Sequence, residues 1–199
     1  MVKYIELLRK DFNLVKKVTP LTENPEKSRL GKYEINDNFL SFWFYFYDKN
    51  RSYIEQERFE EIRNFFDNQF NGYLGRKFEK FIIELIKTGK VLPEFEFTKV
   101  GNQWGKCETG TYEIDVLALN SKEEVLFGEC KWSEDVNALE VLSELHMKAE
   151  FVKWNNEKRK EIFAVFAKSF SKKINEFEGR KVYCFDLKDL EKALKRKGE

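Results

Sequence analysis

Three charged side chains in the middle of the chain have the types and spacing to bind a metal ion and a phosphate. Residues 113–119 and 125–131 read as two strands joined by a turn, and the second strand ends in Glu129-x-Lys131. Side chains two positions apart on a strand point to the same face. Pairing of the two strands as a hairpin would therefore place Asp115 beside Glu129 and Lys131. An ordinary half-buried hairpin would avoid two carboxylates and an ammonium on one patch.

The chemistry expected of this patch is metal-assisted hydrolysis. A hard cation such as Mg2+ or Mn2+ takes oxygen ligands, so we expect Asp115 and Glu129 to hold one or two ions. The backbone carbonyl of Cys130 is a further oxygen ligand. Such an ion lowers the pKa of an attacking water and stabilises charge on a phosphate oxygen. Lys131 would position the water or neutralise the phosphate. Glu79, at the edge of a helical apolar stripe, would bind the ion directly or through water.

Each of these residues also has a purely structural interpretation. An E-x-K pattern alone is common on strands, and the aspartate 14 positions earlier together with the upstream helix glutamate shifts the balance toward a metal site. Glu113 shares a strand face with Asp115 and is interpreted as solvent-facing or as lying behind the ligands. His146 is interpreted as a surface or core-edge histidine, with a water relay as the alternative. Lys148, on the following helix, could face the cleft and touch a phosphate.

Composition limits the class of protein without fixing its partner. The 199 residues are 42% hydrophobic and 16% aromatic, which predicts a packed core, and the net charge of +1 neither supports nor excludes nucleic-acid binding. The chain has no CxxC pair and a single histidine, which argues against zinc. Widely spaced cysteines favour reduced thiols in a cytoplasmic protein. No stretch approaches the ~20 apolar residues of a membrane span, so no membrane contact is expected.

Residues 1–70 predict a helical segment that includes part of a winged helix. A helix over 2–12 precedes two strand-like runs, 14–21 and 32–35, around a polar tip. Asp37 is predicted to cap the next helix. The aromatic run 39–47 is interpreted as a buried packing helix, with a base-stacking or partner-binding surface as the alternative.

Residues 71–199 predict a second domain with a mixed α/β sheet flanked by helices. Apolar runs typical of strands alternate along it with segments whose apolar residues have helical spacing. Ser133 or Asp135 is expected to cap the helix that follows the central hairpin. The run over 162–167 is continuously apolar, as in a strand covered on both faces. A helix over 51–70 is predicted to lead from the first segment into this domain. The predicted helices of the domain are 74–87, 136–155, 170–177 and 189–197; its predicted strands are 94–100, 113–119, 125–131, 162–167 and 182–185, with a glycine-rich loop over 101–110.

These residues resemble a known superfamily. Glu79, Asp115 and Glu129-Cys130-Lys131, in the order α-β-β-β-α-β, look like the PD-(D/E)XK nucleases with their restriction-endonuclease-like fold. A closer resemblance is to the C-terminal region of archaeal P-loop ATPases, in which an ATPase domain and a winged helix precede a nuclease-like domain. The matching segments are 33–44, Gly101 with Trp104, 113–115 and 128–132.

The resemblance implies a Mg2+- or Mn2+-dependent endonuclease acting on DNA, but the chain departs from the pattern in two places. Ile114 replaces the proline that names the motif, which is tolerable because that proline only shapes the strand entry. No GxxxxGK[ST] sequence is present, so nucleotide hydrolysis is not carried over. The alternatives are an inactive nuclease-fold module that binds DNA or a separate partner ATPase, and a protein-interacting regulatory domain. A homodimer also remains open.

Overall fold

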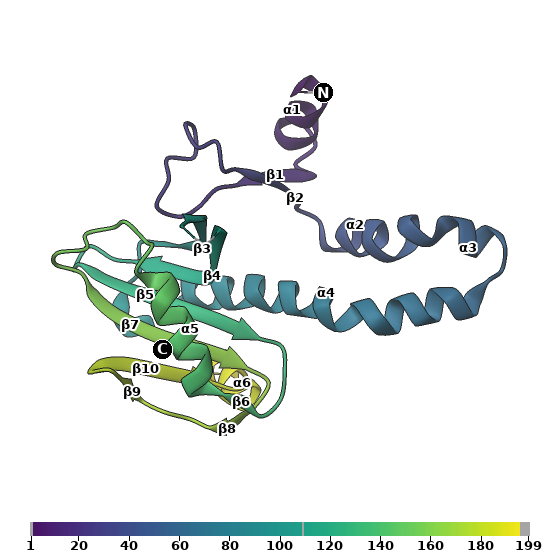
Figure 1. Cartoon of the computed structure of the whole chain (residues 1–199). Coiled ribbons are helices and arrows are strands. Elements are labelled where there is room, and N and C mark those ends of the chain that lie inside the picture. Colours follow the sequence, from purple (N-terminus) through teal and green to yellow (C-terminus); the bar gives the residue numbers. More distant parts are fainter. Residues whose placement is uncertain (1, 109, 196–199) are drawn as a thin grey trace. The chain divides into compact units, whose positions relative to one another are not determined.

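The computed structural model describes residues 2–108 and 110–195. The chain forms two compact units, which are described separately. One contains the residues up to Thr19 together with Pro25–Tyr73, and the other contains Pro20–Asn24 and the residues from Leu74 onward. The elements of both units are labelled in Figure 1.

The second unit is built on a six-stranded mixed sheet, which confirms the expected α/β class. The spatial order of the strands is β3-β4-β5-β7-β10-β9. The pairs β3–β4, β4–β5 and β10–β9 are antiparallel, whereas β7 runs parallel to both β5 and β10. The bounds are β3 (Lys99–Cys107), β4 (Gly110–Leu119), β5 (Glu124–Lys131), β7 (Lys160–Ala167), β9 (Glu176–Phe177) and β10 (Arg180–Phe185).

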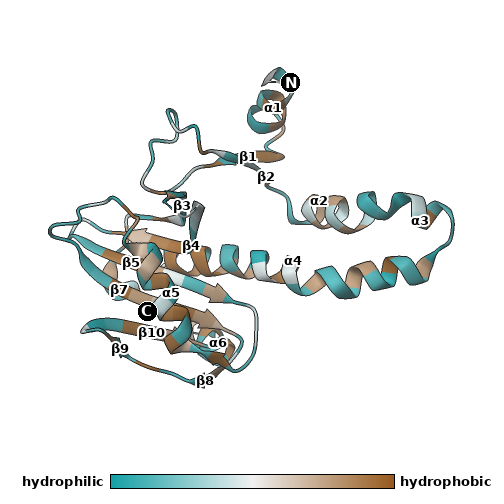
Figure 2. Cartoon of the chain, viewed as in Figure 1, coloured by the Kyte–Doolittle hydropathy of each residue, from teal (hydrophilic) through white to brown (hydrophobic). Residues whose placement is uncertain are grey.

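Helices cover both faces of this sheet. One core cluster includes the buried residues of α5 (Ala138–Ala149), and a second cluster includes those of α4 (Phe59–Lys87) and α6 (Leu187–Lys195). Strand β7 alternates between them, since Phe163 belongs to the first cluster and Ala164 to the second. The expectation of a strand covered on both faces is confirmed. Figure 2 shows apolar residues along the central strands.

A β-bulge in β4 interrupts the alternation of faces next to Asp115. Gly101 of β3 pairs with Leu117, but Gln103 pairs with Ile114, so β4 carries one extra residue. Ile114 and Leu117 consequently both join the cluster under α5. Bulges of this kind re-aim a side chain and are frequent beside functional sites. The extra residue lies between Ile114 and Leu117, so Glu113 precedes it. Glu113 and Asp115 both lie close enough to the Glu79 carboxylate to interact with its charge, in keeping with the expectation that they share a strand face.

Several boundaries before the central hairpin also differ from the predictions. Residues 101–107 are not a loop, because β3 extends to Cys107 and pairs with β4 along its length. Residue 109 of the predicted loop lies outside the described residues. The predicted strand over 94–100 is instead a 3-10 turn, Pro93–Phe95, followed by the start of β3 at Lys99. Pairing with β4, which a local pattern does not reveal, decides where this edge strand lies.

The helix α5 is shorter than expected at both ends. It begins after Asn137, whose side-chain oxygen accepts from the amide of Leu139 at 3.2 Å, so neither Ser133 nor Asp135 is the cap. The preceding residues form β6 (Val136–Asn137), which pairs with β8 (Phe170–Lys172). The predicted helix over 170–177 is wrong, because this segment contains two short strands instead. Strand β8 pairs with β6, and strand β9 pairs with β10. The closing helix α6 starts at Leu187, and residues 196 and 197 lie outside the described part.

The helix α4 is continuous where two separate helices, 51–70 and 74–87, were predicted. It runs through Gly72 and Gly75 to Lys87 and ends as expected before Gly89, which has a φ of 66°. The break lies earlier. The helix expected over 51–70 is divided into α3 (Arg51–Glu55) and α4, and Glu57 between them has a φ of 56°.

The first unit contains the helix and two-stranded ribbon that the sequence indicates. Its elements are α1 (Val2–Lys10), β1 (Val15–Val18), β2 (Lys32–Ile35), α2 (Asn38–Phe42), a π-helical segment Trp43–Tyr47, a 3-10 turn Asp48–Asn50 and α3. β1 and β2 pair antiparallel. Asp37 caps α2 as expected, because its carboxylate accepts from the Leu40 amide at 2.7 Å.

The aromatic run over 39–47 is not a fully buried helix. Phe46 is the member that is buried, and its ring packs 4.9 Å from Phe66 and 5.2 Å from Tyr73 of α4. Phe39 is 69% exposed, and Phe44 is also exposed. Only part of the run thus serves the packing role that its composition predicted.

Gly128 gives a test of the sheet's close packing. A Cβ atom at this position would lie 2.9 Å from Cβ of Val116 and 3.4 Å from a ring carbon of Phe166, so the backbone must shift to accept it. We expect Gly128→Ala to lower the free energy of unfolding by about 1–3 kcal/mol. The control Gly75→Ala lies in a helix at an ordinary 3.8 Å from Trp132 and should raise it by roughly 0.5–1 kcal/mol. Urea unfolding of both variants measures the difference.

Candidate functional site

Asp115 is held through both its side chain and its backbone at the point where β4 and β5 stop pairing. The ladder between these strands runs from Leu119↔Val125 to Val116↔Gly128. Beyond it, the Asp115 Oδ2 atom accepts from the Cys130 amide at 2.8 Å, where a backbone carbonyl would otherwise be needed. Asn102 donates its side-chain amide to the Asp115 carbonyl at 2.8 Å. The bulge and these two bonds fix the direction of the carboxylate.

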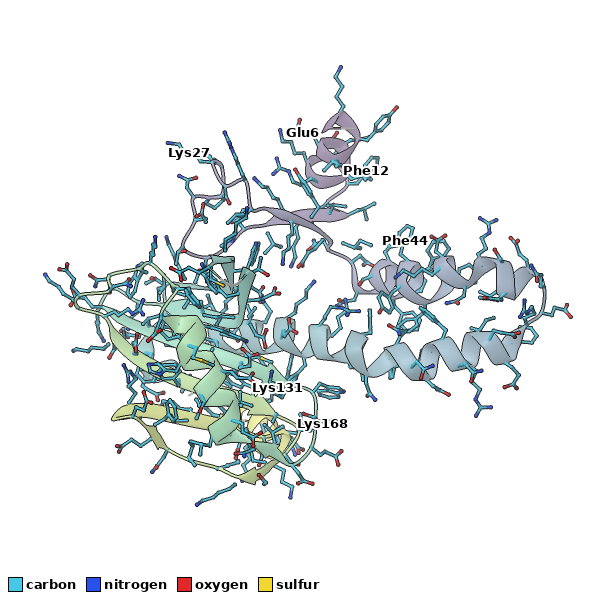
Figure 3. All side chains as sticks on the ribbon, viewed as in Figure 1. Glu6, Phe12, Lys27, Phe44, Lys131 and Lys168 are labelled. Carbon is cyan, nitrogen blue, oxygen red and sulfur yellow. The ribbon has the colours of Figure 1, made fainter. Side chains whose placement is uncertain are left out.

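Glu129 is a buried carboxylate whose two oxygens contact two lysines. It is 5% exposed. Its Oε1 atom accepts from the Nζ atoms of Lys131 and Lys148, both at 3.0 Å, and Lys148 also reaches Oε2 at 3.1 Å. Lys131 lies at the end of β5 and is labelled in Figure 3, and Lys148 lies in the last turn of α5. A buried charge needs such partners.

The acidic residues repel one another across the site. Burial raises the pKa of Asp115 to about 7, with further contributions from the carboxylates of Glu129 and Glu79. Burial likewise raises the pKa of Glu79, and the nearby charge of Glu113 adds to it. A group that resists ionisation beside like charges is a common feature of functional sites.

Lys131 stays protonated in spite of its surroundings. Burial alone would lower its pKa, but the Glu129 carboxylate and the hydrogen bond to it raise the pKa above the ordinary value. The Cys130 thiol has its pKa raised well above its usual range, because it is buried and close to Asp115. A thiol held neutral in this way is a poor metal ligand, which leaves its backbone carbonyl as the ligand expected from the sequence.

The donor set fits a cation held by two carboxylates. Among the described residues, no three histidine, cysteine, aspartate or glutamate side chains are close enough to hold a metal together. Glu79 is therefore not gathered with Asp115 and Glu129 as a third direct ligand. Mg2+ is usually bound by one or two carboxylates, with waters and substrate phosphates completing its shell. Asp115 and Glu129 are the two carboxylates that could supply such ligands.

Two contributors were not foreseen from the sequence. Lys148 was expected at most to touch a phosphate, but it contacts Glu129. It follows the buried Leu145 by three positions, so it borders the apolar stripe of α5, and that spacing was the available signal. Asn102 carried no signal, because its role depends on the bulge. His146 is a core-edge residue as interpreted: it pairs with Glu178 at 3.1 Å and packs against Phe163.

The fold and site define an α/β protein with a carboxylate–lysine cluster at the edge of its central hairpin. A family model described as archaea bacterial proteins of unknown function, DUF234, matches residues 43–165, which is more than half of the chain. The chain belongs to this family.

A curated relative extends the match beyond the family model. The chain is 36% identical over 189 residues to the uncharacterized protein MJECL04 of Methanocaldococcus jannaschii. The alignment covers 90% of this chain and 39% of that protein, so the chain spans about two fifths of the relative's length. No solved structure matches the chain. Within residues 2–108 and 110–195, no helix is long and apolar enough to cross a membrane.

Proposed function

We propose that the chain is a Mg2+- or Mn2+-dependent, endonuclease-like protein that hydrolyses phosphodiester bonds in DNA. The observation that carries the proposal is the half-buried Asp115 carboxylate at the end of the hairpin, which interacts with the charges of Glu129 and Lys131 and has its pKa raised to about 7. The order of helix, three antiparallel strands, helix and parallel strand supports a restriction-endonuclease-like fold, as the resemblance implies.

The residues divide the work as follows. Asp115 and Glu129 hold the cation, with the Cys130 carbonyl as a further oxygen. When bound, the ion supplies an acidified water and neutralises charge on a phosphate oxygen. Lys131 orients the water or contacts the scissile phosphate. Glu79 acts from α4 at longer range, through its charge or through water.

The lysine contacts of Glu129 favour a second candidate, a nuclease-fold module that binds DNA or a separate partner ATPase without cutting. Glu129 already receives three hydrogen bonds from two ammonium groups. A carboxylate satisfied in this way is stable without a cation. At the site itself, the two candidates differ in whether a cation replaces the lysines at Glu129.

A nicking assay separates them. Purified protein is incubated with supercoiled plasmid, single-stranded DNA and branched DNA in Mg2+ or Mn2+, with EDTA as the blank. We expect nicking by the wild-type protein and none by Asp115→Ala. Identical behaviour of the two proteins would refute the nuclease proposal. A salt-dependent gel shift without cleavage would select the binding module.

A further inference from the structure

Lys148 is the part of the cluster that the hydrolytic roles leave unused. Its ammonium lies 3.0 Å from Oε1 and 3.1 Å from Oε2 of Glu129, so it bridges both oxygens of one carboxylate. Lys131 reaches the same Oε1 atom from the neighbouring position on β5. A carboxylate offers about four lone-pair positions, and these contacts occupy most of them.

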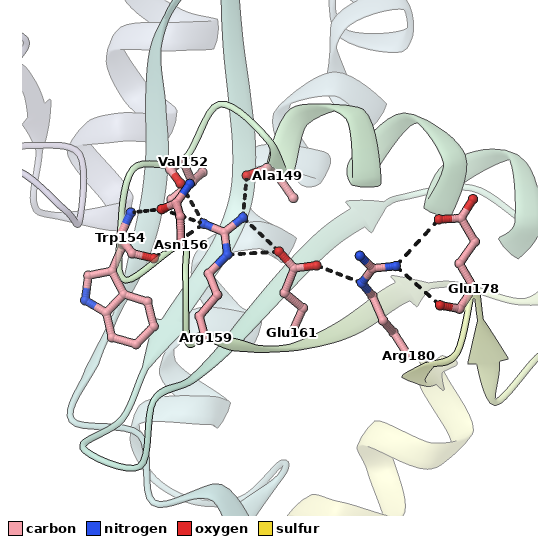
Figure 4. A network of polar contacts seen from close by, with 8 residues as sticks. All are labelled: Ala149, Val152, Trp154, Asn156, Arg159, Glu161, Glu178 and Arg180. Atoms are coloured by element: carbon pink, nitrogen blue, oxygen red, sulfur yellow. Dashed lines mark hydrogen bonds and ion pairs between the residues drawn. The ribbon is translucent and has the colours of Figure 1, made fainter.

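The position of Lys148 is set by the helix that carries it. The end of α5 is fastened by Arg159, whose guanidinium donates to the carbonyl of Ala149 at 3.1 Å and to that of Val152 at 2.6 Å. Figure 4 shows both contacts. Lys148 therefore extends from a fixed helix terminus, while its own side chain is long and flexible. Such an ammonium can leave Glu129 without any movement of the backbone.

The charge at the site determines when the Lys148 ammonium would leave Glu129. Glu129 with its two lysines carries one net positive charge, and the neighbouring Asp115 opposes it. A divalent cation placed between Asp115 and Glu129 would face two ammonium groups that compete for the same oxygens. Cation and lysine therefore exclude each other at Glu129, and a displaced ammonium has to find another anion nearby.

We propose that Lys148 is an exchangeable counter-ion of Glu129, which a divalent cation releases so that its ammonium can contact a phosphate of the DNA. This inference rests on the proposed function. Its consequence is positive coupling: the cation frees a phosphate-binding group, and by thermodynamic reciprocity a bound phosphodiester strengthens cation binding. Lys148 is thus a positioning residue in the free protein and a DNA ligand in the loaded one.

The first test measures cation binding without DNA. Mn2+ is titrated into wild type, Lys148→Met and Lys148→Arg at pH 8, by calorimetry and by electron paramagnetic resonance of free Mn2+. Lys148→Met removes the competitor, so we expect it to bind Mn2+ at least about fivefold more tightly than wild type. Lys148→Arg keeps the charge and should stay close to wild type. The control Lys158→Met, at an exposed position, should change nothing.

The second test measures the coupling. DNA affinity is followed by fluorescence anisotropy in Ca2+ and in EDTA, because Ca2+ fills carboxylate sites without the need for cleavage. Wild type should gain at least about fivefold in affinity with Ca2+, and Lys148→Met should lose most of that gain. Unchanged Mn2+ affinity in a natively folded Lys148→Met, judged by circular dichroism, would overturn the exchange.

The outcomes separate the two proposals. If Asp115→Asn abolishes Mn2+ binding but Lys148→Met leaves it unchanged, the cation site stands and the exchange fails. If Asp115→Asn and wild type bind Mn2+ equally, or not at all, the proposed function fails together with the exchange. Tighter Mn2+ binding by Lys148→Met that also requires Asp115 supports both.

Discussion

At pH 8 and without divalent cations, Asp115→Asn is expected to raise the free energy of unfolding by roughly 2 kcal/mol while abolishing cleavage. The amide is nearly isosteric and keeps an oxygen to accept from the Cys130 amide. It removes a charge that burial and the carboxylates of Glu129 and Glu79 oppose. The shift from 3.8 to about 7 sets an upper bound of about 4 kcal/mol, and solvent at this half-buried position screens part of it.

The sign of this effect depends on pH. The pKa of Asp115 is higher in the folded chain than the ordinary value of 3.8, so the folded state binds the proton more tightly. Stability is therefore lost as the pH rises from about 4 to about 7. Urea midpoints of wild type and Asp115→Asn should nearly coincide at pH 4 and diverge by pH 8. A variant less stable than wild type at pH 8 would mean that the carboxylate is favourably paired.

Glu150→Gln is the matched control. This carboxylate is exposed just beyond α5, and its neutralisation should change stability by less than about 0.5 kcal/mol at either pH. Comparing Asp115→Asn with Glu150→Gln tests whether the loss of stability at high pH is specific to the site or would arise from any acidic residue. A site that lowers the stability of its own fold is the usual consequence of gathering like charges for function.

Arg159→Met is expected to have the opposite effect and to lower the free energy of unfolding by about 3–5 kcal/mol. The Arg159 side chain is 7% exposed, and it pairs with Glu161 at 2.8 Å besides its contacts to the end of α5. Glu161 in turn accepts from Arg180 at 2.8 Å (Figure 4). Methionine fills much of the volume but leaves two carbonyls and the partly buried Glu161 carboxylate short of donors. Chemical denaturation measures the loss.

A double-mutant cycle isolates the ion pair from the capping role of Arg159. Glu161→Gln alone and the double variant complete the cycle, and a coupling of about 1–3 kcal/mol is expected for partners in direct contact. Additive losses would mean that the pair contributes nothing and that the helix-end carbonyls carry the whole effect. Lys158→Met, one position earlier and exposed, controls for loss of a nearby positive charge.

The parts of the fold that the sequence predicted are those whose signal is local. The continuous apolar run over 162–167 predicted a strand buried on both faces, and the spacing of Glu129 and Lys131 predicted neighbouring side chains. The parts it did not predict depend on pairing between distant residues. The bulge beside Asp115 arises from the register of β3 on β4, and the strand over 170–172 exists because β6 pairs with it.

The site residues likewise divide into those with a local sequence signal and those placed by packing between distant segments. Asp115, Glu129 and Lys131 were predictable because one hairpin carries them all. The contact of Lys148 with Glu129 required the packing of α5 on the sheet, although the apolar stripe ending at Ala149 restricted where that lysine could point. Glu79 was placed in the acidic neighbourhood correctly, yet the distance that keeps it out of a three-ligand cluster could not be derived from helical spacing.

The central claim is that Asp115 and Glu129 bind a divalent cation, and crystals soaked in Mn2+ test it most directly. Diffraction data collected at the manganese absorption edge should give an anomalous peak within about 2.2 Å of oxygens from both carboxylates, with the Lys148 ammonium moved away from Glu129. No peak at a saturating Mn2+ concentration, with Lys131 and Lys148 still bonded to Glu129, would contradict the claim.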